Sequence, residues 1–388
     1  MPAITRSRPI HEKSISTMSD KYKILISGGG TGGHIFPAVS IANALKRRLN
    51  CDILFVGAEN RMEMEKVPAA GYQIVGLPVA GFNRKNLFKN IPVLYKLWKS
   101  IRKARNIVKE FKPDIAIGVG GYASGPVLKA AQKAGVPTLL QEQNSYAGVT
   151  NKLLGKDARK ICVAYEGMDR FFPGDKVILT GNPVRKDLVD AAANRAKARE
   201  SFGLAAERPT LLVVGGSLGA LTLNESMEAG LRRLVDMGIQ VIWQTGRNFG
   251  DRGKEISKGM KGAVVTRFIN DMAAAYAAAD LVVSRAGASS ISELQLLGKP
   301  CVLVPSPNVA EDHQTKNARA LSDRGAAKFV SDAEAREKLI PMVIDLMSNT
   351  PESRKQLAEM EANIRKMALP NSDERIVDEV MKIICPAK

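Results

Sequence analysis

Short apolar runs alternate with longer amphipathic stretches along most of the chain, which is the pattern of parallel α/β sheets. In the first half, the apolar runs predict strands at residues 23–27, 52–56, 114–119, 138–141, 160–164 and 177–180. In the second half, they predict strands at residues 210–214, 240–244, 263–266, 280–284 and 301–304. The chain has 388 residues, a length typical of roughly two domains. We therefore expect two doubly wound α/β domains that face each other.

Three segments lie outside this alternation. Residues 185–208, between the two sets of strands, are charged and alanine-rich and predict the crossover with a helix. The stretch from about residue 373 to residue 384 predicts a helix with an apolar face made by Ile376, Val377, Val380 and Ile383. Residues 1–20 are polar and lack the apolar core of a signal peptide, so they predict a disordered extension.

The most informative stretch is Ser27-Gly28-Gly29-Gly30-Thr31-Gly32-Gly33-His34, which joins the first predicted strand to a helix. Glycines let the backbone approach a ligand closely, and a helix N-terminus favours phosphate or a developing negative charge. The spacing also fits a dinucleotide fingerprint. This glycine spacing and Glu59, near the end of the second predicted strand, are compatible with an alternative function as a nicotinamide-dependent oxidoreductase. His34 either faces a substrate and titrates near neutral pH or caps and packs the helix.

Further loops rich in glycine or polar residues also follow predicted strands, and ligands bind at the carboxyl ends of strands in open parallel sheets. They are residues 118–126 with Tyr122 and Ser124, residues 141–144, residues 215–220, residues 284–293, and residues 312–317 with Gln314 and Asn317. The amides and the Ser217 hydroxyl of the third loop suit a diphosphate. Residues 141–144 either bind a hydroxyl-rich ligand such as a sugar or serve as a turn. Glu293, expected near the first turn of its helix, either binds a ribose diol or interacts favourably with the helix dipole.

Charge and composition narrow the classes of partner. The formal net charge of +18 and a pI near 9.7 favour an anionic partner. Aromatic residues make up only 5% of the chain and no RNA-binding motif or zinc-finger spacing is present, so nucleic acid is not the expected partner. The four cysteines are scattered without a CxxC pair and indicate neither a disulfide framework nor a metal site.

The segment from Phe82 to Lys112 is basic and amphipathic, and its single acidic residue is Glu110. Such a segment is typical of peripheral attachment to an anionic membrane surface. Each basic residue near such a surface contributes about 1 kcal/mol. The alternative is an outer helix with its apolar face on the sheet and its charges in water. No apolar run is long enough to span a bilayer.

Taken in order, the loops resemble the MurG family of bacterial peptidoglycan N-acetylglucosaminyltransferases. The matching segments are Gly28-Gly-Gly-Thr-Gly-Gly-His-Ile-Phe-Pro-Ala38, Gly120-Gly-Tyr-Ala-Ser-Gly-Pro126, Glu142-Gln-Asn144, Ala147-Gly-Val-Thr-Asn-Lys152, Gly181-Asn-Pro-Val-Arg185, Gly215-Gly-Ser-Leu-Gly-Ala220, Phe268-Ile-Asn-Asp-Met-Ala273, Arg285-Ala-Gly-Ala288 through Glu293, and His313-Gln-Thr-Lys-Asn-Ala318. They cover nearly the whole chain after residue 20. Two places depart from the family pattern. Gln141 stands where a histidine often precedes the Glu-Gln-Asn motif, and the loop Ala288-Ser-Ser-Ile-Ser292 varies around the small and hydroxyl residues of the family.

The resemblance implies a GT-B fold, in which two Rossmann-like domains enclose an interdomain cleft. It implies an inverting hexosyltransferase that moves GlcNAc from UDP-GlcNAc to the 4-hydroxyl of MurNAc in undecaprenyl-diphospho-MurNAc-pentapeptide (lipid I). The products are lipid II and UDP, and no metal ion or other cofactor is expected. The implied division is an acceptor- and membrane-facing domain at residues 21–184, a UDP-GlcNAc-binding domain at 185–365, and a C-terminal helix at 366–388 that returns to the first domain.

The resemblance also implies a location on the cytoplasmic face of the bacterial membrane, with other cell-wall synthesis proteins as partners. Another GT-B lipid glycosyltransferase and a UDP-sugar epimerase are the nearest alternatives. The acceptor-side segments at residues 120–126 and 142–152 argue against both.

Residue roles follow from matching positions in the family motifs. His34 is our candidate for the base that takes the hydroxyl proton, with Glu142 and Tyr122 orienting it or the acceptor. Ile269 resembles the family's uracil contact, Arg185 a nucleotide contact, Ser217 the diphosphate contact and Glu293 the ribose contact. The remaining expected UDP-GlcNAc contacts are Thr31, Gly32, Gly33, Asn144, Ala288, Ser289, Ser290, Ile291, Ser292 and Gln314.

Overall fold

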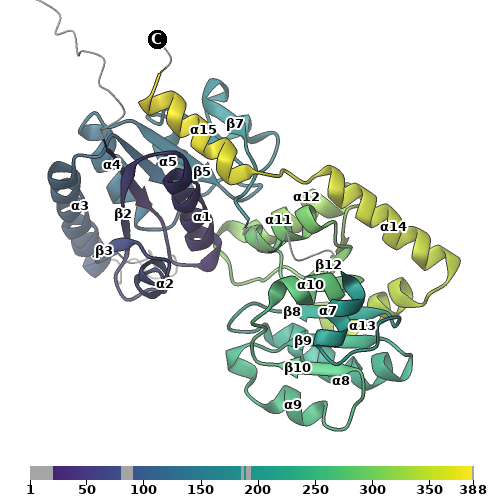
Figure 1. Ribbon diagram of the computed structural model, residues 1–388. Helices are drawn as coiled ribbons and strands as arrows, with labels where there is room; N and C mark the ends of the chain where they lie inside the picture. The colour runs from purple at the N-terminus through teal and green to yellow at the C-terminus, as the bar shows by residue number, and fades with distance from the viewer. Residues whose placement is uncertain (1–20, 80–90, 185–187, 189–193, 387–388) are drawn as a thin grey trace, which may run out of the picture.

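The first half of the chain builds a seven-stranded parallel sheet (Figure 1). The computed structural model describes residues 21–79, 91–184, 188 and 194–386. The strand order is β3-β2-β1-β4-β5-β6-β7, which is doubly wound about β1 and β4. The strands are β1 Tyr22–Ser27, β2 Cys51–Ala58, β3 Gln73–Leu77, β4 Ile115–Gly118, β5 Thr138–Glu142, β6 Lys160–Val163 and β7 Val177–Leu179.

Helices cover both faces of this sheet because apolar side chains leave each buried strand in both directions. Along β1, Ile24 and Ile26 pack toward α1 and the last helix, whereas Leu25 packs toward α3 and α4. The helices of this half are α1 Gly32–Arg48, α2 Glu63–Ala69, α3 Ile91–Phe111, α4 Ser124–Lys133 and α5 Val149–Gly155, with 3-10 turns at Met168–Arg170 and Gly174–Lys176.

The second half builds a six-stranded parallel sheet in the order β10-β9-β8-β11-β12-β13. Its strands are β8 Thr210–Val214, β9 Gln240–Gln244, β10 Ala263–Thr266, β11 Leu281–Ser284, β12 Cys301–Leu303 and β13 Lys328–Phe329. Two buried clusters again lie on opposite faces, one with Leu212 and Ile242 and the other with Leu211 and Val213.

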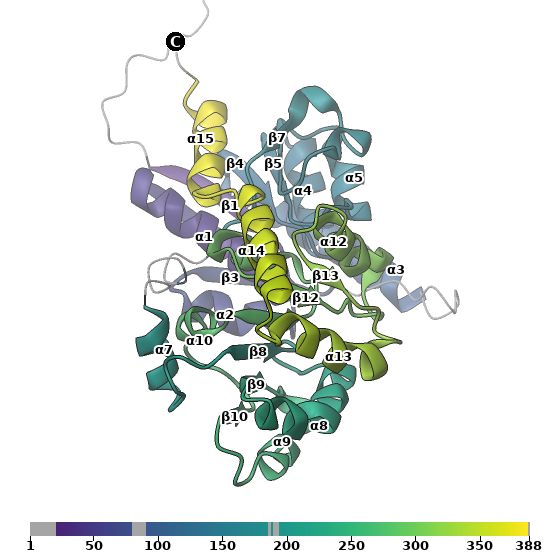
Figure 2. The ribbon, with the colours of Figure 1, turned by 90° about the vertical axis from the view of Figure 1, so that its right-hand side faces the viewer.

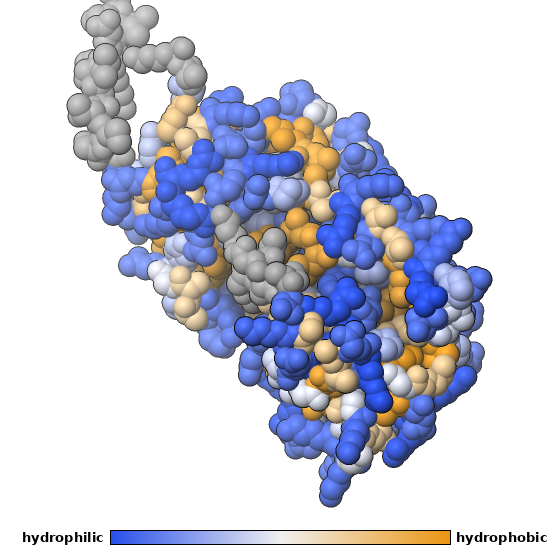
Figure 3. Space-filling model, turned by 45° about the vertical axis from the view of Figure 1, so that its right-hand side comes forward, coloured by the Kyte–Doolittle hydropathy of each residue, from blue (hydrophilic) through white to orange (hydrophobic). Residues whose placement is uncertain are grey.

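The helices of the second half are α7 Arg195–Ser201, α8 Leu221–Asp236, α9 Arg252–Ile256, α10 Met272–Ala278, α11 Ala288–Leu297, α12 His313–Ser322, α13 Ala335–Met347 and α14 Pro351–Lys366, with 3-10 turns at Arg247–Phe249 and Ala310–Asp312. Burial of apolar side chains inside both halves leaves the face seen in Figure 3 largely hydrophilic, with smaller apolar patches between charged residues. In the described ranges, no helix combines the length and the apolar character needed to cross a membrane.

The final helix, α15 Ser372–Ile384, returns to the first half of the molecule (Figures 1 and 2). Ile376, Val377 and Val380 are fully buried in the cluster that also holds side chains of α1. At the rim, Arg47 on α1 forms ion pairs with Asp373 at 2.9 Å and Glu374 at 2.7 Å. This helix therefore packs the C-terminal part of the described chain on the first sheet.

The predicted strands are all confirmed, with small differences at their ends, but two strands were missed. Strand β3 reads Gln-Ile-Val-Gly-Leu, a short run interrupted by a glycine, and it lies at the edge of its sheet. Strand β13 has only two residues. Both lie at the outer edge of a sheet, where neither length nor alternation makes a strand easy to recognise.

We expect Ile376→Ala to lower the free energy of unfolding by about 2–5 kcal/mol, because it removes a fully buried side chain between α15 and the sheet. Urea unfolding followed by circular dichroism measures the change. Ile383→Ala, on the partly exposed turn of the same helix, is the matched control and should cost less. Equal losses for the two variants would contradict the packing described here.

Candidate active site

Loops at the carboxyl ends of both sheets meet between the two halves of the molecule. The segment after β1 begins α1, and Gly33 of this helix faces Ser289 of α11, so that a Cβ built on Gly33 would lie 3.9 Å from the Ser289 hydroxyl oxygen. The loops after β5 and β7 also contact α11 and α12 through hydrogen bonds. Carboxyl ends of strands are where open α/β sheets bind ligands.

The glycine-rich loops after β1 and β4 touch through their backbones. A Cβ built on Gly121 would lie 2.4 Å from the Gly29 carbonyl oxygen, and the φ of Gly121 is +86°. Any side chain there would collide with the first loop. The Ser124 hydroxyl, which the sequence indicated as a polar handle for ligand, instead donates within this contact, to the carbonyls of Ser27 at 2.9 Å and Gly120 at 2.8 Å.

His34 lies at this contact with a defined tautomer. Its Nδ1 is 3.1 Å from the Gly29 carbonyl oxygen and 3.2 Å from the Thr31 hydroxyl. Since a carbonyl only accepts, the Nδ1 atom carries the proton and donates it to Gly29. The Nε2 atom is then the acceptor, and it packs against Gly120, where a built Cβ would lie 2.9 Å away.

The His34 imidazole is neutral at pH 7. The pKa of His34 is lowered to about 4, mainly by burial and to a smaller extent by His313, whereas the hydrogen bond to Gly29 and the charge of Glu63 act to raise it. Burial dominates because it disfavours the charged imidazolium. A neutral ring with a free Nε2 lone pair is the form that accepts a proton.

The Glu142 carboxylate holds the loop after β5 instead of contacting His34 directly. Oε1 accepts from the Asn144 backbone and side-chain N–H groups at 3.1 and 3.2 Å. Oε2 accepts from the Gly148 N–H at 3.1 Å and from Asn151 Nδ2 at 2.9 Å. With four donors and 2% exposure, this carboxylate is a fixed acceptor that positions Asn144.

Two buried asparagines join the halves of the molecule. Asn182 Nδ2 donates to the Gln143 carbonyl and to the Ser292 hydroxyl, both at 3.0 Å. Asn317 Oδ1 accepts from the Ser145 N–H at 2.9 Å, and Asn317 Nδ2 donates to Asn144 Oδ1 at 3.1 Å. Asn317 is fully buried, and its hydrogen bonds support the loop after β5.

The second half contributes a glycine loop and two helix N-termini. Ser217 is exposed in the loop at residues 215–220, which leads into α8. Ala288 begins α11, and the Ser289 hydroxyl oxygen is buried without a hydrogen-bond partner. Gln314 Oε1 accepts from the Ser306 N–H at 2.9 Å, which ties α12 to the loop after β12.

The structure corrects the expected position of Glu293. This residue lies in the second turn of α11, not near its first, and its carboxylate accepts from the Tyr276 hydroxyl at 2.9 Å. Its neighbours Ile291 and Ser292 have side-chain partners within the second half of the molecule. Ile291 is fully buried in the core, and the Ser292 hydroxyl donates to the Ala288 carbonyl at 3.0 Å.

The other expected site residues are placed as follows. Ile269 is buried, and its backbone N–H donates to Gln244 Oε1 at 2.9 Å. Tyr122 is 58% exposed and lines an apolar groove beside α3, α4 and α5.

Arg185 lies outside the described residues. Across the described residues, no group of three or more His, Cys, Asp or Glu side chains is arranged to hold a metal ion.

Two doubly wound domains with facing glycine loops define the class of GT-B-fold proteins, and comparison with known proteins gives the family. Residues 24–163 match the glycosyltransferase family 28 N-terminal domain, and residues 210–376 match the glycosyltransferase family 28 C-terminal domain. The chain belongs to glycosyltransferase family 28, within which its curated relatives are of the MurG type.

One such relative, from Bacteroides fragilis, is 58% identical over 379 residues, which are 96% of this chain and 98% of the relative. It is named UDP-N-acetylglucosamine--N-acetylmuramyl-(pentapeptide) pyrophosphoryl-undecaprenol N-acetylglucosamine transferase. The crystal structure of Acinetobacter baumannii MurG is 29% identical with a TM-score of 0.73, covering 94% of this chain and all of that one. A putative UDP-N-acetylglucosamine 2-epimerase from Listeria monocytogenes shares the fold at 12% identity, with a TM-score of 0.66 and coverage of 95% of this chain and 98% of that one.

We expect Gly120→Ala to lower turnover about 100-fold, because its Cβ would displace the His34 ring and reactions are sensitive to misplacement of about 1 Å. Steady-state kinetics of sugar transfer measures the loss. Gly71→Ala is the matched control, since Gly71 also has a positive φ but has nothing within 4 Å of its built Cβ. Equal activity in the two variants would contradict the placement of His34.

Proposed function

We propose that the protein transfers GlcNAc from UDP-GlcNAc to the MurNAc of lipid I, giving lipid II and UDP in peptidoglycan synthesis. The observation that carries this proposal is the 58% identity, over 96% of the chain, to a transferase named for that reaction. Likeness to the epimerase extends to the fold only, at 12% identity. The alternative function, a nicotinamide-dependent oxidoreductase, explains neither the second glycine loop nor the match to both glycosyltransferase domains.

The second half of the molecule binds the donor in this proposal. The loop at residues 215–220 opens the sixteen-residue helix α8, so its amides and the Ser217 hydroxyl suit the UDP diphosphate. Glu293, whose carboxylate accepts from the Tyr276 hydroxyl, is assigned to the ribose hydroxyls. The starts of α11 and α12 carry further expected donor contacts, namely Ala288, Ser289, Ser290 and Gln314. Ile269 is assigned to the uracil of UDP.

The first half supplies the base. The acceptor 4-hydroxyl attacks the anomeric carbon from the side opposite to UDP, which inverts that carbon, while His34 Nε2 takes the hydroxyl proton. Charge that develops on the leaving diphosphate is stabilised by the amides of residues 215–220 and the N-terminus of α8. In this proposal Thr31, Gly32, Gly33 and Asn144 contact UDP-GlcNAc, and Glu142 acts by holding the loop that carries Asn144.

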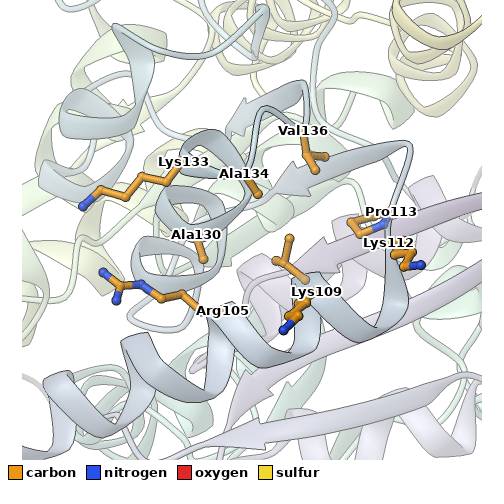
Figure 4. A pocket seen from close by; sticks show the side chains of 9 residues that line it. Arg105, Lys109, Lys112, Pro113, Ala130, Lys133, Ala134 and Val136 are labelled. Carbon is orange, nitrogen blue, oxygen red and sulfur yellow. The ribbon is translucent and has the colours of Figure 1, made fainter.

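The same half faces an anionic, cytoplasmic membrane surface in this proposal. An apolar groove of about 750 Å³ lies beside α3, α4 and α5, lined by Leu97, Ile101, Tyr122 and Leu153, with Arg105, Lys129 and Lys133 also along it. A smaller hollow of about 480 Å³ next to it is basic, and Figure 4 shows Arg105 and Lys109 of α3 and Lys133 of α4 around it. Apolar side chains beside basic ones suit peripheral attachment. Residues 82–90 of the predicted membrane segment lie outside the described residues.

We expect His34→Ala to lower transfer of radiolabelled GlcNAc to a lipid I analogue about 10²- to 10⁴-fold, the usual contribution of a positioned base. UDP binding should be retained, and wild-type transfer should persist in EDTA. His11→Ala, in the segment before the described residues, is the control. If the wild-type protein binds UDP-GlcNAc but does not transfer the sugar, the assignment of the donor stands and the assignment of lipid I as acceptor is contradicted. Near-normal turnover of His34→Ala would contradict the assignment of His34 as the general base.

We expect Leu94→Ser, at a position 55% exposed on α3, to weaken binding to vesicles that contain phosphatidylglycerol. Added salt should weaken wild-type binding as well, because it screens the basic residues. Cosedimentation measures both effects. Met237→Ser, at a position 49% exposed in the second half, is the control. The same loss in both variants, or none in Leu94→Ser, would contradict attachment through α3.

A further inference from the structure

A buried carboxylate, Glu63, lies beneath the first glycine loop. It is the first residue of α2 and is fully buried. A buried charge requires hydrogen-bond partners, and both oxygens have one: Oε1 accepts from the Ala58 N–H at 2.9 Å, and Oε2 accepts from the Gly30 N–H at 3.0 Å. No feature of the sequence distinguishes this glutamate from its exposed neighbour Glu65.

The fold makes room for this side chain with two glycines. A Cβ built on Gly29 would lie 2.1 Å from Glu63 Oε1, and one built on Gly57 would lie 2.6 Å from Glu63 Cγ. Any larger residue at either position would force Glu63 out of its place. The loop and the carboxylate are therefore fitted to each other.

One peptide group connects Glu63 to His34. The N–H of the peptide between Gly29 and Gly30 donates to Glu63, while the carbonyl of the same peptide accepts from His34 Nδ1 at 3.1 Å. Hydrogen bonds in series polarise one another, so a carboxylate at the N–H makes the carbonyl a stronger acceptor. The chain of contacts is carboxylate, peptide, imidazole.

We propose that Glu63 is a positioning residue for the transfer reaction, acting on His34 through the Gly29–Gly30 peptide as the aspartate of a Ser-His-Asp triad acts by direct contact. This inference rests on the proposed role of His34. In the reaction, the acceptor O–H bond breaks and an N–H bond forms at Nε2. The acceptor oxygen bonds to the anomeric carbon, and the electrons of the broken C–O bond leave with UDP. The negative charge of Glu63 favours the imidazolium that forms.

The charged groups that act on His34 come from both halves of the molecule. Among the residues that the structure describes, they are Glu63 on α2 and His313 on α12, which act in opposite directions. His313 disfavours the imidazolium, and the negative charge of Glu63 favours it. Removing the Glu63 charge should therefore lower the pKa of His34.

The test is Glu63→Gln, which removes the charge and leaves one acceptor oxygen for two N–H donors. We expect kcat to fall about 10- to 100-fold, as is typical when a group that orients a functional histidine is lost. The KM for UDP-GlcNAc should stay within about twofold, because the proposed diphosphate, ribose and uracil contacts lie on the other domain. The acid limb of the kcat–pH profile should move to lower pH.

The matched control is Glu65→Gln, the same change on the same helix at a side chain that is 77% exposed; it should keep the wild-type kcat and profile. Glu63→Asp retains the charge, so its acid limb should stay near the wild-type position even where kcat falls. A fall in kcat with an unmoved acid limb in Glu63→Gln would overturn the proposal, as would a wild-type kcat.

Titration of His34 by NMR in wild type and Glu63→Gln separates this inference from the proposed function. A lower pKa in the variant supports the peptide connection even where no transfer is detected, and an unchanged pKa overturns it. In a His34→Ala background, Glu63→Gln should cause no further loss of turnover, since its effect passes through His34. A full additional loss would also overturn the proposal.

Discussion

The close backbone contact between the loops after β1 and β4 is the constraint on which the rest of the site depends. The Gly29 carbonyl lies where a Gly121 side chain would be, and the Ser124 hydroxyl bonds to both loops. That carbonyl also accepts from His34 Nδ1. The same contact that joins two strands of the sheet thus sets the tautomer and orientation of the candidate base.

A polar seam joins this base to the donor half. Asn182 and Asn317 each hydrogen-bond across the boundary, to Ser292 of α11 and to Ser145 after β5 respectively. Each such bond contributes about 0.5–1.5 kcal/mol net. These bonds help to set the orientation of the two domains relative to each other. The seam suits a transferase that binds its donor on one domain and its acceptor on the other.

Local patterns predict the two sheets well because buried parallel strands read as continuous apolar runs, as in β1 and β8. The edge strand β3 and the two-residue strand β13 lack such a run, so the sequence pattern does not predict them. Motif order places the glycine loops and His34 at one edge, but long-range side-chain partners are not encoded locally. Glu63 contacts Gly30 from 33 positions away, and Asn317 contacts Ser145 from 172. The interior placement of Ile291 follows from the packing of α11.

The most direct test of the account is the protonation state of His34 in the wild-type protein, measured by ¹⁵N NMR of labelled histidine across pH. The chain has only three histidines, so His34→Ala assigns the signal. The account predicts a neutral ring protonated on Nδ1 at pH 7 that titrates only as the pH approaches about 4. A ring protonated on Nε2, or one that titrates near the ordinary histidine pKa of about 6.5, would contradict the assignment of Nε2 as the proton acceptor in a buried site.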